Sequence, residues 1–382
     1  MSDKLPNLVP DDEELDLDTV NQVKDRLAHI QLLYDTGKPF FPRALLEDLS
    51  RQIDQGAEEV VINDVDDMPQ KYSLKVPAWC ADFASTYRIN YATTQHLTHL
   101  TLICPEQALR TDHTPVSIVY VRSLHSPSNN TVEQVRERFN EARDLWLASA
   151  TYRDLDRIIS TLSLTVPITK IVCFGLGSLA PLIDDDSDTD ESLSLSMSMS
   201  MLLDNDTGIS LSDASPINYT FDWNLTRAHV QHAAVETIRT ALQNRGMADA
   251  SGVECYAQDP SYDAVDREFL ATIGITALDD PKGFLELDAN TLVLSVSPNV
   301  PIKQVVADVQ WPAAMVWNTV LSVKDEPEEW VKRIMGNGEA QWASPFTTDP
   351  DSQRVRTMVE QYATATLDDA NGFFGDITVY MR

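Results

Sequence analysis

The stretch Ile168–Leu182, ITKIVCFGLGSLAPL, decides the fold of this 382-residue chain. Its first part, up to Phe174, is apolar apart from Thr169 and Lys170. Within it Ile171–Phe174 is continuously apolar, as expected for a strand buried on both faces of a parallel sheet. Gly175, Gly177 and Ala180 follow in the spacing G-x-G-x-x-G/A. After a strand, this spacing indicates a loop that lets a cofactor pyrophosphate approach the backbone, but a tight turn at the end of a buried strand has the same pattern. Both interpretations stay open.

Beyond this stretch, short apolar runs alternate with segments of helical periodicity. Strands are predicted at 168–174, 253–258, 275–278, 291–296 and 313–317, and helices at 227–245, 261–272, 281–287 and 301–309. Strands that are separated by helices pair in parallel and are covered on both faces. We therefore expect an α/β fold, with a Rossmann-like three-layer domain and a mostly parallel sheet over residues 126–325.

The residues before this domain have a mixed pattern. From 18 to about 55 the apolar residues recur at helical spacing, whereas 100–104 and 117–122 are typical of strands. Residues 16–125 are therefore predicted to form a small N-terminal helical and strand module.

Helical spacing also covers 132–150, where the apolar residues fall on one face. At the other end of the chain, residues 326–382 are predicted to be a C-terminal extension with a helix near 351–362 and a strand at 376–380. The pattern does not say whether this strand joins the main sheet.

The net charge of -30 limits the partners of the protein. It repels the phosphate backbone of nucleic acids, so no direct nucleic-acid binding is expected. Much of the acid lies in residues 1–15, predicted to be a disordered tail, and in residues 184–220, predicted to be a disordered acidic insertion rich in Ser and Met. Ser and Thr beside carboxylates in the insertion suit an acidophilic kinase, and an inert insertion is the alternative.

The cysteines and the N-terminus bear on the compartment. Cys80, Cys104, Cys173 and Cys255 have no C-x-x-C spacing and favour buried free thiols in a reducing environment. The first residues have no basic region followed by an apolar stretch, so no signal peptide is expected. The longest apolar window, Leu162–Ile183, is interrupted by prolines and a lysine and is not expected to span a membrane. We expect a protein of the cytoplasm or the nucleus.

Asp259 is the polar residue that directly follows the strand predicted at 253–258. Dinucleotide-binding proteins place a carboxylate at such a position to hold the ribose hydroxyls. Asp259-Pro260 is also a standard N-cap with proline at the first position of the helix predicted at 261–272, and the two roles are compatible. In the segment Gly175–Ala180, here called the glycine loop, the hydroxyl of Ser178 is expected to bind a phosphate or to cap a turn.

Signatures of catalysis and of metal binding are missing from the sequence. The pairs His96–His99 and His229–His232 have the spacing of two ligands, but neither has a Glu at base spacing or a nearby C-x-x-C, so no metal is expected. There is no G-x-S-x-G elbow, P-loop or zinc-protease motif. No catalytic residue is assigned.

The chain from Trp146 to Asn318 resembles the Sensitivity-to-Red-light-Reduced family, here called SRR-like. The residues that carry the resemblance, in family order, are Trp146, Ser149, Leu155, Leu162, the hallmark Ile171–Ser178, Gln231, Ala233, Ala234, Tyr256, Asp259, Pro260, Asp266, Phe269, Leu270, Gly274, Trp317 and Asn318. The chain departs from the family at Ser295–Val300, where members often have a Met-Pro-His-Cys-like segment, and in its acidic insertion. The insertion and the long terminal extensions are similar to those of the larger fungal-type members.

The resemblance implies a regulatory protein. Plant members are linked to light signalling and the circadian clock, animal members to haem synthesis and proliferation, and a yeast member to microtubule-related phenotypes. We accordingly predict a non-catalytic protein in signalling, circadian or stress-type regulation, whose Rossmann-like domain binds a protein partner and a nucleotide-type ligand. The predicted ligand-binding residues are Gly175, Gly177, Ser178, Asp259, Gln231 and Asn318.

The alternative is an enzyme that uses a nucleotide-type cofactor. Its candidate classes are S-adenosylmethionine-dependent methyltransferases and NAD(P)-dependent oxidoreductases. In such an enzyme Gly175, Gly177 and Ser178 would face the cofactor, and Asp259 would hold the ribose hydroxyls.

Overall fold

The structure is a computed structural model that describes residues 17–98, 113–122, 130–161, 165–180, 223–246, 252–323, 331–334, 340–343 and 347–382. The predicted acidic tail, the strand predicted at 100–104, Cys104 and the predicted insertion 184–220 lie outside the described residues.

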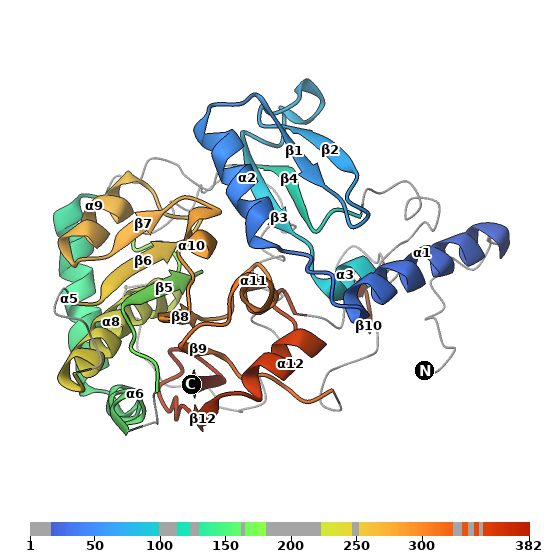
Figure 1. Ribbon diagram of the computed structural model, residues 1–382. Coiled ribbons are helices and arrows are strands. Elements are labelled where there is room, and N and C mark those ends of the chain that lie inside the picture. The colour runs from blue at the N-terminus through green and yellow to red at the C-terminus, as the bar shows by residue number, and fades with distance from the viewer. Residues whose placement is uncertain are drawn as a thin grey trace.

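A seven-stranded, mostly parallel sheet forms the centre of the molecule (Figure 1). Its order is β12-β13-β9-β8-β5-β6-β7, with β5 in the middle of the five strands β9-β8-β5-β6-β7. The strands are β5 (Lys170–Phe174), β6 (Glu254–Gln258), β7 (Thr276–Leu278), β8 (Thr291–Ser295), β9 (Ala314–Asn318), β12 (Ala363–Thr366) and β13 (Ile377–Met381). β5 to β9 are parallel, whereas β13 runs antiparallel to both β9 and β12. The five strands predicted from the sequence are therefore confirmed.

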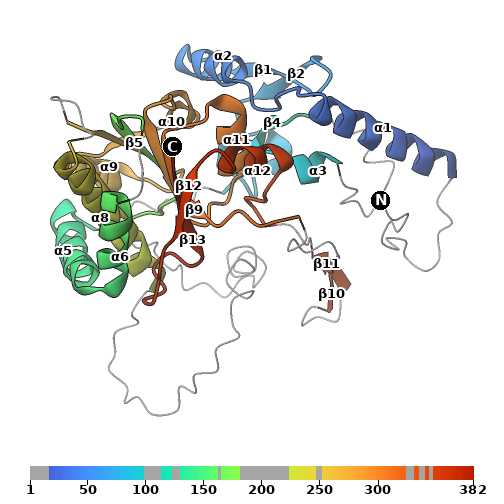
Figure 2. The same ribbon diagram turned by 60° about the horizontal axis from the view of Figure 1, so that its bottom comes forward.

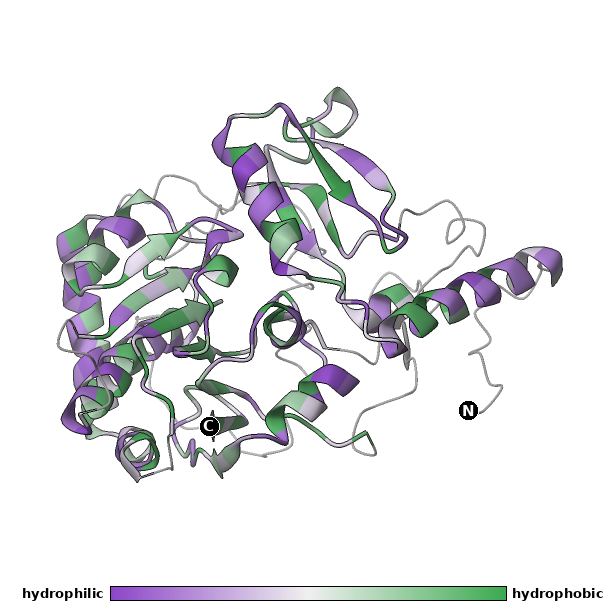
Figure 3. Ribbon diagram, viewed as in Figure 1, coloured by the Kyte–Doolittle hydropathy of each residue, from purple (hydrophilic) through white to green (hydrophobic). Residues whose placement is uncertain are grey.

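Both faces of the sheet are buried, as the apolar run in β5 predicts. Ile171 and Cys173 point into one hydrophobic core, and Val172 and Phe174 point into the other, because successive side chains of a strand face opposite sides. Figure 3 shows the hydrophobic colour of β5 at the centre of the sheet. The sheet is thus the middle one of three layers.

Helices fill the two outer layers (Figure 1). One core is covered by α5 (Val132–Ala148), α6 (Ala150–Thr161), α8 (Trp223–Asn244) and α9 (Ala264–Thr272). The other is covered by α10 (Lys282–Leu285), α11 (Ile302–Val309) and α12 (Gln353–Val359), together with the N-terminal residues. α5 starts with a capping box between Thr131 and Gln134 and buries the apolar face that its spacing predicts.

The N-terminal module combines helices with two hairpins. It contains α1 (Leu17–Asp35), α2 (Arg43–Asp54), the β1 (Glu59–Asn63) and β2 (Pro69–Ser73) pair, a 3-10 turn (Ala78–Cys80), the β3 (Thr86–Tyr91) and β4 (Val116–Val121) pair, and α3 (Thr94–Thr98). Its buried residues, such as Ile62 and Ile89, belong to the same core as Val293 and Trp317 of the sheet. The module therefore packs directly on one face of the main sheet.

The C-terminal residues divide between a separate hairpin and the main sheet (Figure 2). β10 (Val331–Ile334) and β11 (Ala340–Ala343) pair with each other, whereas β12 and β13 extend the central sheet beside β9. In that pairing Ile377 lies opposite Asn318. The segment expected to be an extension thus supplies two strands of the sheet, which the sequence pattern had left open.

The start of α9 corrects one sequence-based interpretation. Asp263, not Asp259, is the N-cap of this helix, and it forms a capping box with Asp266. Between Asp259 and Asp263 the chain makes a turn, in which the N–H of Tyr262 donates to the carbonyl of Asp259. The prediction that Asp259-Pro260 caps the helix is therefore wrong, because this turn moves the first helical residue to Ala264.

Two smaller expectations concern thiols and membranes. Cys80, Cys173 and Cys255 are free and buried, which confirms the prediction for the three cysteines that the structure describes. Within the same parts of the chain, no helix combines the length and the apolar character needed to cross a bilayer.

Candidate functional site

The sequence-predicted residues gather at one edge of the sheet, where the parallel strands end. β5 ends just before Gly175, β6 just before Asp259, and β9 at Asn318. Ser297 follows β8 at the same edge. In open α/β sheets, ligands bind outside the carboxyl ends of the strands, so this edge is the candidate site.

The glycine loop adopts a backbone that requires glycine at both predicted positions. Gly175 and Gly177 have φ angles of 69° and 83°, in the left-handed region that other residues rarely adopt. A Cβ atom at position 175 would lie 3.2 Å from the Cβ of Pro298, and one at position 177 would lie 3.4 Å from the Cβ of Ala228 in α8. The loop is therefore both a tight turn and a close packing point between β8 and α8.

Asp259 reaches from the end of β6 to the glycine loop. Its Oδ2 accepts a hydrogen bond from the N–H of Gly177 at 2.8 Å, and its Oδ1 accepts one from the N–H of Ser261 at 2.8 Å. The residue is only 8% exposed. A carboxylate thus lies where the glycine pattern predicts that a phosphate would approach the backbone.

Asp266 holds the other half of the loop and was not predicted as a site residue. Its Oδ1 accepts from the N–H groups of Leu179 at 2.8 Å and Ala180 at 3.1 Å, and its Oδ2 accepts from the hydroxyl of Ser178 at 2.8 Å. The side chain is fully buried, and burial raises the pKa of its carboxyl although these hydrogen bonds oppose the shift. The signal that was available is the Asp263-x-x-Asp266 spacing of a capping box.

Asn318 fixes the loop that follows β8. Its Oδ1 accepts a hydrogen bond from the N–H of Ser297 at 2.7 Å, and Ser297 has a φ of 46°, a left-handed conformation that is uncommon outside glycine. The next residue, Pro298, is the one that contacts Gly175. Asn318 is therefore connected to the glycine loop through two residues of the segment where the chain departs from the family pattern.

Gln231 was also predicted to bind the ligand, but its side chain is hydrogen-bonded to a different segment from the glycine loop. It is buried in α8, and its Nε2 donates to the carbonyl of Phe373 at 3.0 Å, the same oxygen that accepts from Nε of Arg227. Phe373 lies in the turn between β12 and β13. Gln231 thus holds that turn against α8, and its side chain does not take part in the hydrogen bonds of the glycine loop.

A second polar group, around Asp280, lies where β6 and β7 meet the N-terminal module. The carboxylate of Asp280 accepts from the hydroxyl of Tyr91 at 2.5 Å and from Nε2 of Gln258 at 3.0 Å. The Oε1 of Gln258 accepts from the N–H of Gly283 at 2.7 Å. Burial raises the pKa of Asp280 to about 7, against the opposing effect of these hydrogen bonds and of the charge of Arg88. Asp280 therefore changes its charge close to neutral pH.

The histidines of α8, His229 and His232, are both buried. His232 is fully buried, with Nδ1 2.6 Å from the carbonyl of Ala228 and Nε2 2.8 Å from the hydroxyl of Tyr262. Burial lowers its pKa to about 4, so the ring is neutral at physiological pH. In the described parts of the chain, no three His, Cys, Asp or Glu side chains come together in a group that would hold a metal ion.

The chemistry of the edge follows from these contacts. The N–H groups of Gly177, Leu179 and Ala180 already donate to carboxylates of the protein, so an incoming phosphate would compete with Asp259 and Asp266 for the same donors. It would also meet their negative charges at close range. A ligand that offers hydroxyl donors or a positive charge fits this edge better than one that offers a pyrophosphate.

A family model described as the SRR1 domain matches residues 151–370, which is more than half of the chain. The chain belongs to the SRR1 domain family. This confirms the SRR-like resemblance and extends it from Asn318 through α12 and β12 to the turn before β13. All six predicted site residues lie within the SRR1 domain, and their assignment to a ligand stays a prediction. Neither the curated proteins nor the solved structures contain a match to this chain.

Proposed function

We propose that this member of the SRR1 domain family is a regulatory protein that binds a nucleoside-type ligand at the carboxyl edge of its sheet. The observation that carries the proposal is the position of Asp259, which is buried, follows β6 and faces the glycine loop after β5. A carboxylate in this place accepts the paired hydroxyls of a ribose in dinucleotide-binding proteins. Gly175, Gly177, Ser178, Asp259 and Asn318 would surround the ligand.

The strand order supports a Rossmann-like interpretation of the domain. Numbered from β5, the order β7-β6-β5-β8-β9 is 3-2-1-4-5, the order of the doubly wound nucleotide-binding sheet. The connections go to one side of β5 first and then to the other, so a crevice is expected between the loops that follow β5 and β8. Gly175 and Pro298 belong to those two loops.

The chemistry of the loop narrows the class of ligand. Because Asp259 and Asp266 already accept the loop N–H donors, we infer a ligand without phosphate groups at this position. The hydroxyls of a ribose would donate to Asp259. A dinucleotide would instead bring its pyrophosphate against two carboxylates, so NAD and NADP are disfavoured.

We further propose that an acidophilic kinase phosphorylates this protein and that its domain binds a protein partner. Both would act in the cytoplasm or the nucleus. The family membership and the missing catalytic signatures support a regulatory role. The kinase proposal rests on the Ser and Thr residues beside carboxylates in residues 184–220, which lie outside the described part of the chain.

The second candidate is S-adenosylmethionine-dependent methyl transfer. The specific observation that favours it is β13, which runs antiparallel between β9 and β12 and turns the sheet order into 3-2-1-4-5-7-6, an arrangement typical of methyltransferases. S-adenosylmethionine is a phosphate-free nucleoside with a positive sulfonium, which suits the acidic edge. A shared fold does not establish a reaction, so the catalytic residues stay unassigned.

Ligand titration of the purified full chain tests both candidates. We expect S-adenosylmethionine or adenosine to raise the melting temperature, because a ligand that binds only the native state stabilises it, and we expect no such effect of NAD or NADP. Asp259→Asn should weaken nucleoside binding about tenfold, since the amide keeps one acceptor oxygen and loses the other. Asp263→Asn is the matched control, because asparagine is an equally good N-cap.

The outcomes separate the candidates. If no nucleoside binds at about 10 mM in calorimetry, the ligand proposal is wrong. Binding with formation of S-adenosylhomocysteine on a panel of methyl acceptors would replace the regulatory proposal by the enzymatic one. Binding without turnover would support the regulatory role.

A further inference from the structure

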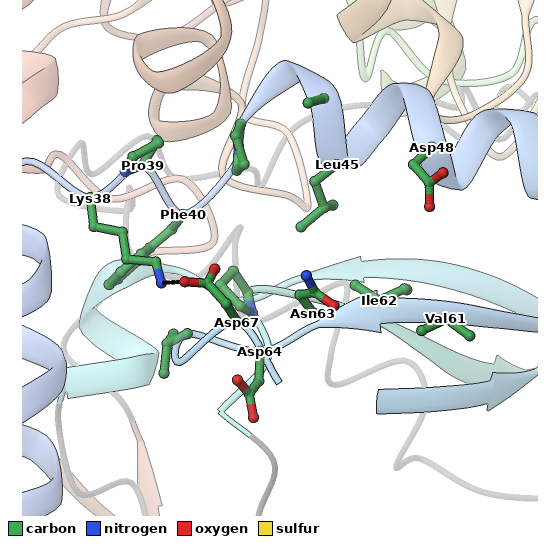
Figure 4. A pocket seen from close by; sticks show the side chains of 14 residues that line it. Lys38, Pro39, Phe40, Leu45, Asp48, Val61, Ile62, Asn63, Asp64 and Asp67 are labelled. Carbon is green, nitrogen blue, oxygen red and sulfur yellow. Dashed lines mark hydrogen bonds and ion pairs between the residues drawn. The ribbon is translucent and has the colours of Figure 1, made fainter. Parts of the chain in front are cut away.

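A cavity of about 380 Å³ lies in the N-terminal module, and none of its lining residues belongs to the loops at the carboxyl edge of the sheet. Figure 4 shows it between α2, which contributes Leu45 and Asp48, and β1, which contributes Val61, Ile62 and Asn63. Its apolar lining comes from Pro39, Phe40, Pro42, Leu45, Val61 and Pro115. Its volume falls in the usual range of ligand sites.

One wall of this cavity is the edge of a strand. Among the described residues β1 pairs with β2 alone. The N–H of Leu74 donates to the carbonyl of Glu58, so the hydrogen-bonded pairs are Glu58–Leu74, Val60–Tyr72 and Ile62–Gln70. In an antiparallel pair the residues between these have their N–H and C=O directed away from the partner strand. The main-chain groups of Val61 and Asn63 therefore point out of the hairpin, towards α2 and the cavity.

Both ends of this edge are closed by contacts within the protein. At Val61 the side chain of Gln52 imitates a neighbouring strand: its Oε1 accepts the N–H at 2.8 Å and its Nε2 donates to the C=O at 3.1 Å. At Val65 the N–H donates to the carbonyl of His113 at 3.0 Å. Between them, the N–H and C=O of Asn63 have no hydrogen-bond partner among the residues that the structure describes.

The unpaired groups of Asn63 define what fits the cavity. One donor and one acceptor on the same residue of a strand are matched by one residue of another extended chain. β1 ends at Asn63 and Val65 lies in the turn that follows, so the open edge between the two closed positions covers only residues 62–64. At about 3.3 Å per extended residue this is at most roughly 10 Å, the length of about three residues of a peptide. The apolar lining suits a hydrophobic side chain on that peptide.

The charges around the cavity indicate the flanking residues of the peptide. Asp48, Asp64 and Asp67 line it, and two cations offset them in part: Arg51 pairs with Asp48, and the Nζ of Lys38 lies 2.6 Å from Asp67. The three carboxylates and two cations leave a net negative charge at the cavity. This acidic lining attracts lysine and arginine side chains. It repels the acidic insertion 184–220, and the net charge of -30 opposes association with a second copy of this chain.

We propose that this cavity is a peptide-binding groove that takes an extended segment of another protein, about three residues long, with an apolar residue between basic ones. The central residue pairs with the N–H and C=O of Asn63, its side chain packs on Leu45 and Val61, and the flanking cations face the acidic lining. This site is independent of the nucleoside site, because the two lie on different elements and share no residue.

Capped tripeptides added to the full chain test the groove. The probes are acetyl-Lys-Val-Lys-amide, the same peptide with an N-methyl group on valine, and acetyl-Glu-Val-Glu-amide. We expect the first to bind saturably and to slow hydrogen exchange of the Asn63 amide. N-methylation removes the donor to the Asn63 carbonyl and should weaken binding about tenfold, and the acidic probe should not bind.

A variant pair on α2 links the binding to the cavity. Ala44 is exposed and lines the cavity, whereas Glu47 is exposed on the same helix and does not line it. Ala44→Trp should reduce affinity at least about tenfold by filling the space, and Glu47→Trp should leave it within about twofold. The proposal is overturned if the Asn63 amide is unaffected by about 10 mM of the basic peptide, if the acidic peptide binds as well, or if N-methylation has no effect. That last comparison uses the unmodified protein and so does not depend on the folding of a variant.

Discussion

The carboxylate of Asp259 accepts a hydrogen bond from the main-chain N–H of Gly177 at 2.8 Å, and so joins the end of β6 to the loop that follows β5. Asp266 does the same for Leu179 and Ala180 on the other side of the loop. The glycine loop is therefore held by two carboxylates from neighbouring segments. This arrangement stabilises the loop and sets the charge that any ligand at this edge meets.

Removing the Asp266 side chain should strongly destabilise the fold. Asp266→Ala leaves the N–H groups of Leu179 and Ala180 and the hydroxyl of Ser178 without their acceptor in a buried place. Because each buried unsatisfied group costs about 1–3 kcal/mol, we expect a loss of about 3 kcal/mol or more in the free energy of unfolding. Urea denaturation measures it, and Asp144→Ala on the exposed side of α5 should change it by no more than about 0.5 kcal/mol. Equal effects of the two variants would contradict the role of Asp266.

Gly177→Val separates backbone strain from packing in the glycine loop. Position 177 has a φ of 83° and a neighbour at 3.4 Å, whereas Gly246 has a φ of 66° with nothing within 4 Å of an added Cβ. A left-handed backbone destabilises both valine variants by about 1–2 kcal/mol. Only the valine at position 177 also crowds Ala228. We expect Gly177→Val to be less stable than Gly246→Val by at least about 1 kcal/mol. Thermal unfolding of both variants decides this, and equal stability would mean that the loop yields to the extra side chain.

Asp280 should make the stability of the protein depend on pH. Its folded-state pKa is raised to about 7, so between about pH 4 and 7 the native state binds more protons than the unfolded state, and the free energy of unfolding falls as the pH rises. Asp280→Asn should reduce this slope by up to about 1.4 kcal/mol per pH unit. The measurement is urea unfolding at several pH values.

Asp349 is the reference for this pH experiment, because burial also raises its pKa to about 7. Asp280→Asn should leave the part of the pH dependence that comes from Asp349. The double variant Asp280→Asn with Asp349→Asn should remove both parts. An unchanged slope in Asp280→Asn would show that its carboxyl titrates near its ordinary value.

Lys303 and Asp351 form a buried ion pair next to Asp349, and each of the pair is 4% exposed or less. Burial acts to lower the pKa of Lys303, but the charges of Asp349 and Asp351 outweigh it and raise the pKa. Lys303→Met should cost about 3–5 kcal/mol, because it leaves a buried carboxylate without its cation. The double variant with Asp351→Asn, which keeps an acceptor for the N–H of Leu321, should cost less than the sum of the single changes. Additive losses in urea unfolding would show that the two charges are not coupled.

Several elements were predictable because their signals are local. The continuous apolar run of β5 and the helical periodicity of α5 and α8 depend only on neighbouring residues, and the structure contains these elements close to the predicted bounds. A turn at Gly175 and Gly177 was likewise one of the two interpretations of their spacing after a strand, and both glycines have positive φ angles in the structure. The family resemblance rested on the same local motifs and is confirmed by the SRR1 match.

Other features depend on partners that are distant in the sequence. Asp266 and the loop it holds are 86 to 88 residues apart, and Gln231 binds a carbonyl 142 residues away. The role of Asp259 as a helix cap was wrong because a turn before α9, absent from the expected pattern, shifts the cap to Asp263. The cavity beside β1 could not be predicted either, since its walls come from a helix and a strand whose relative position depends on the shared core.

By itself, then, the sequence determined the alternation of strands and helices, the glycine turn and the family, because apolar periodicity and backbone preferences act over a few residues. Only the tertiary structure decided that β13 is inserted beside β9, that carboxylates occupy the donors of the glycine loop, and that the main chain of Asn63 has no partner among the described residues. Strand pairing and the matching of buried donors with acceptors are settled between segments far apart in the chain. Which strands pair, and which acceptor each buried donor meets, therefore depends on how the hydrophobic core brings those segments together.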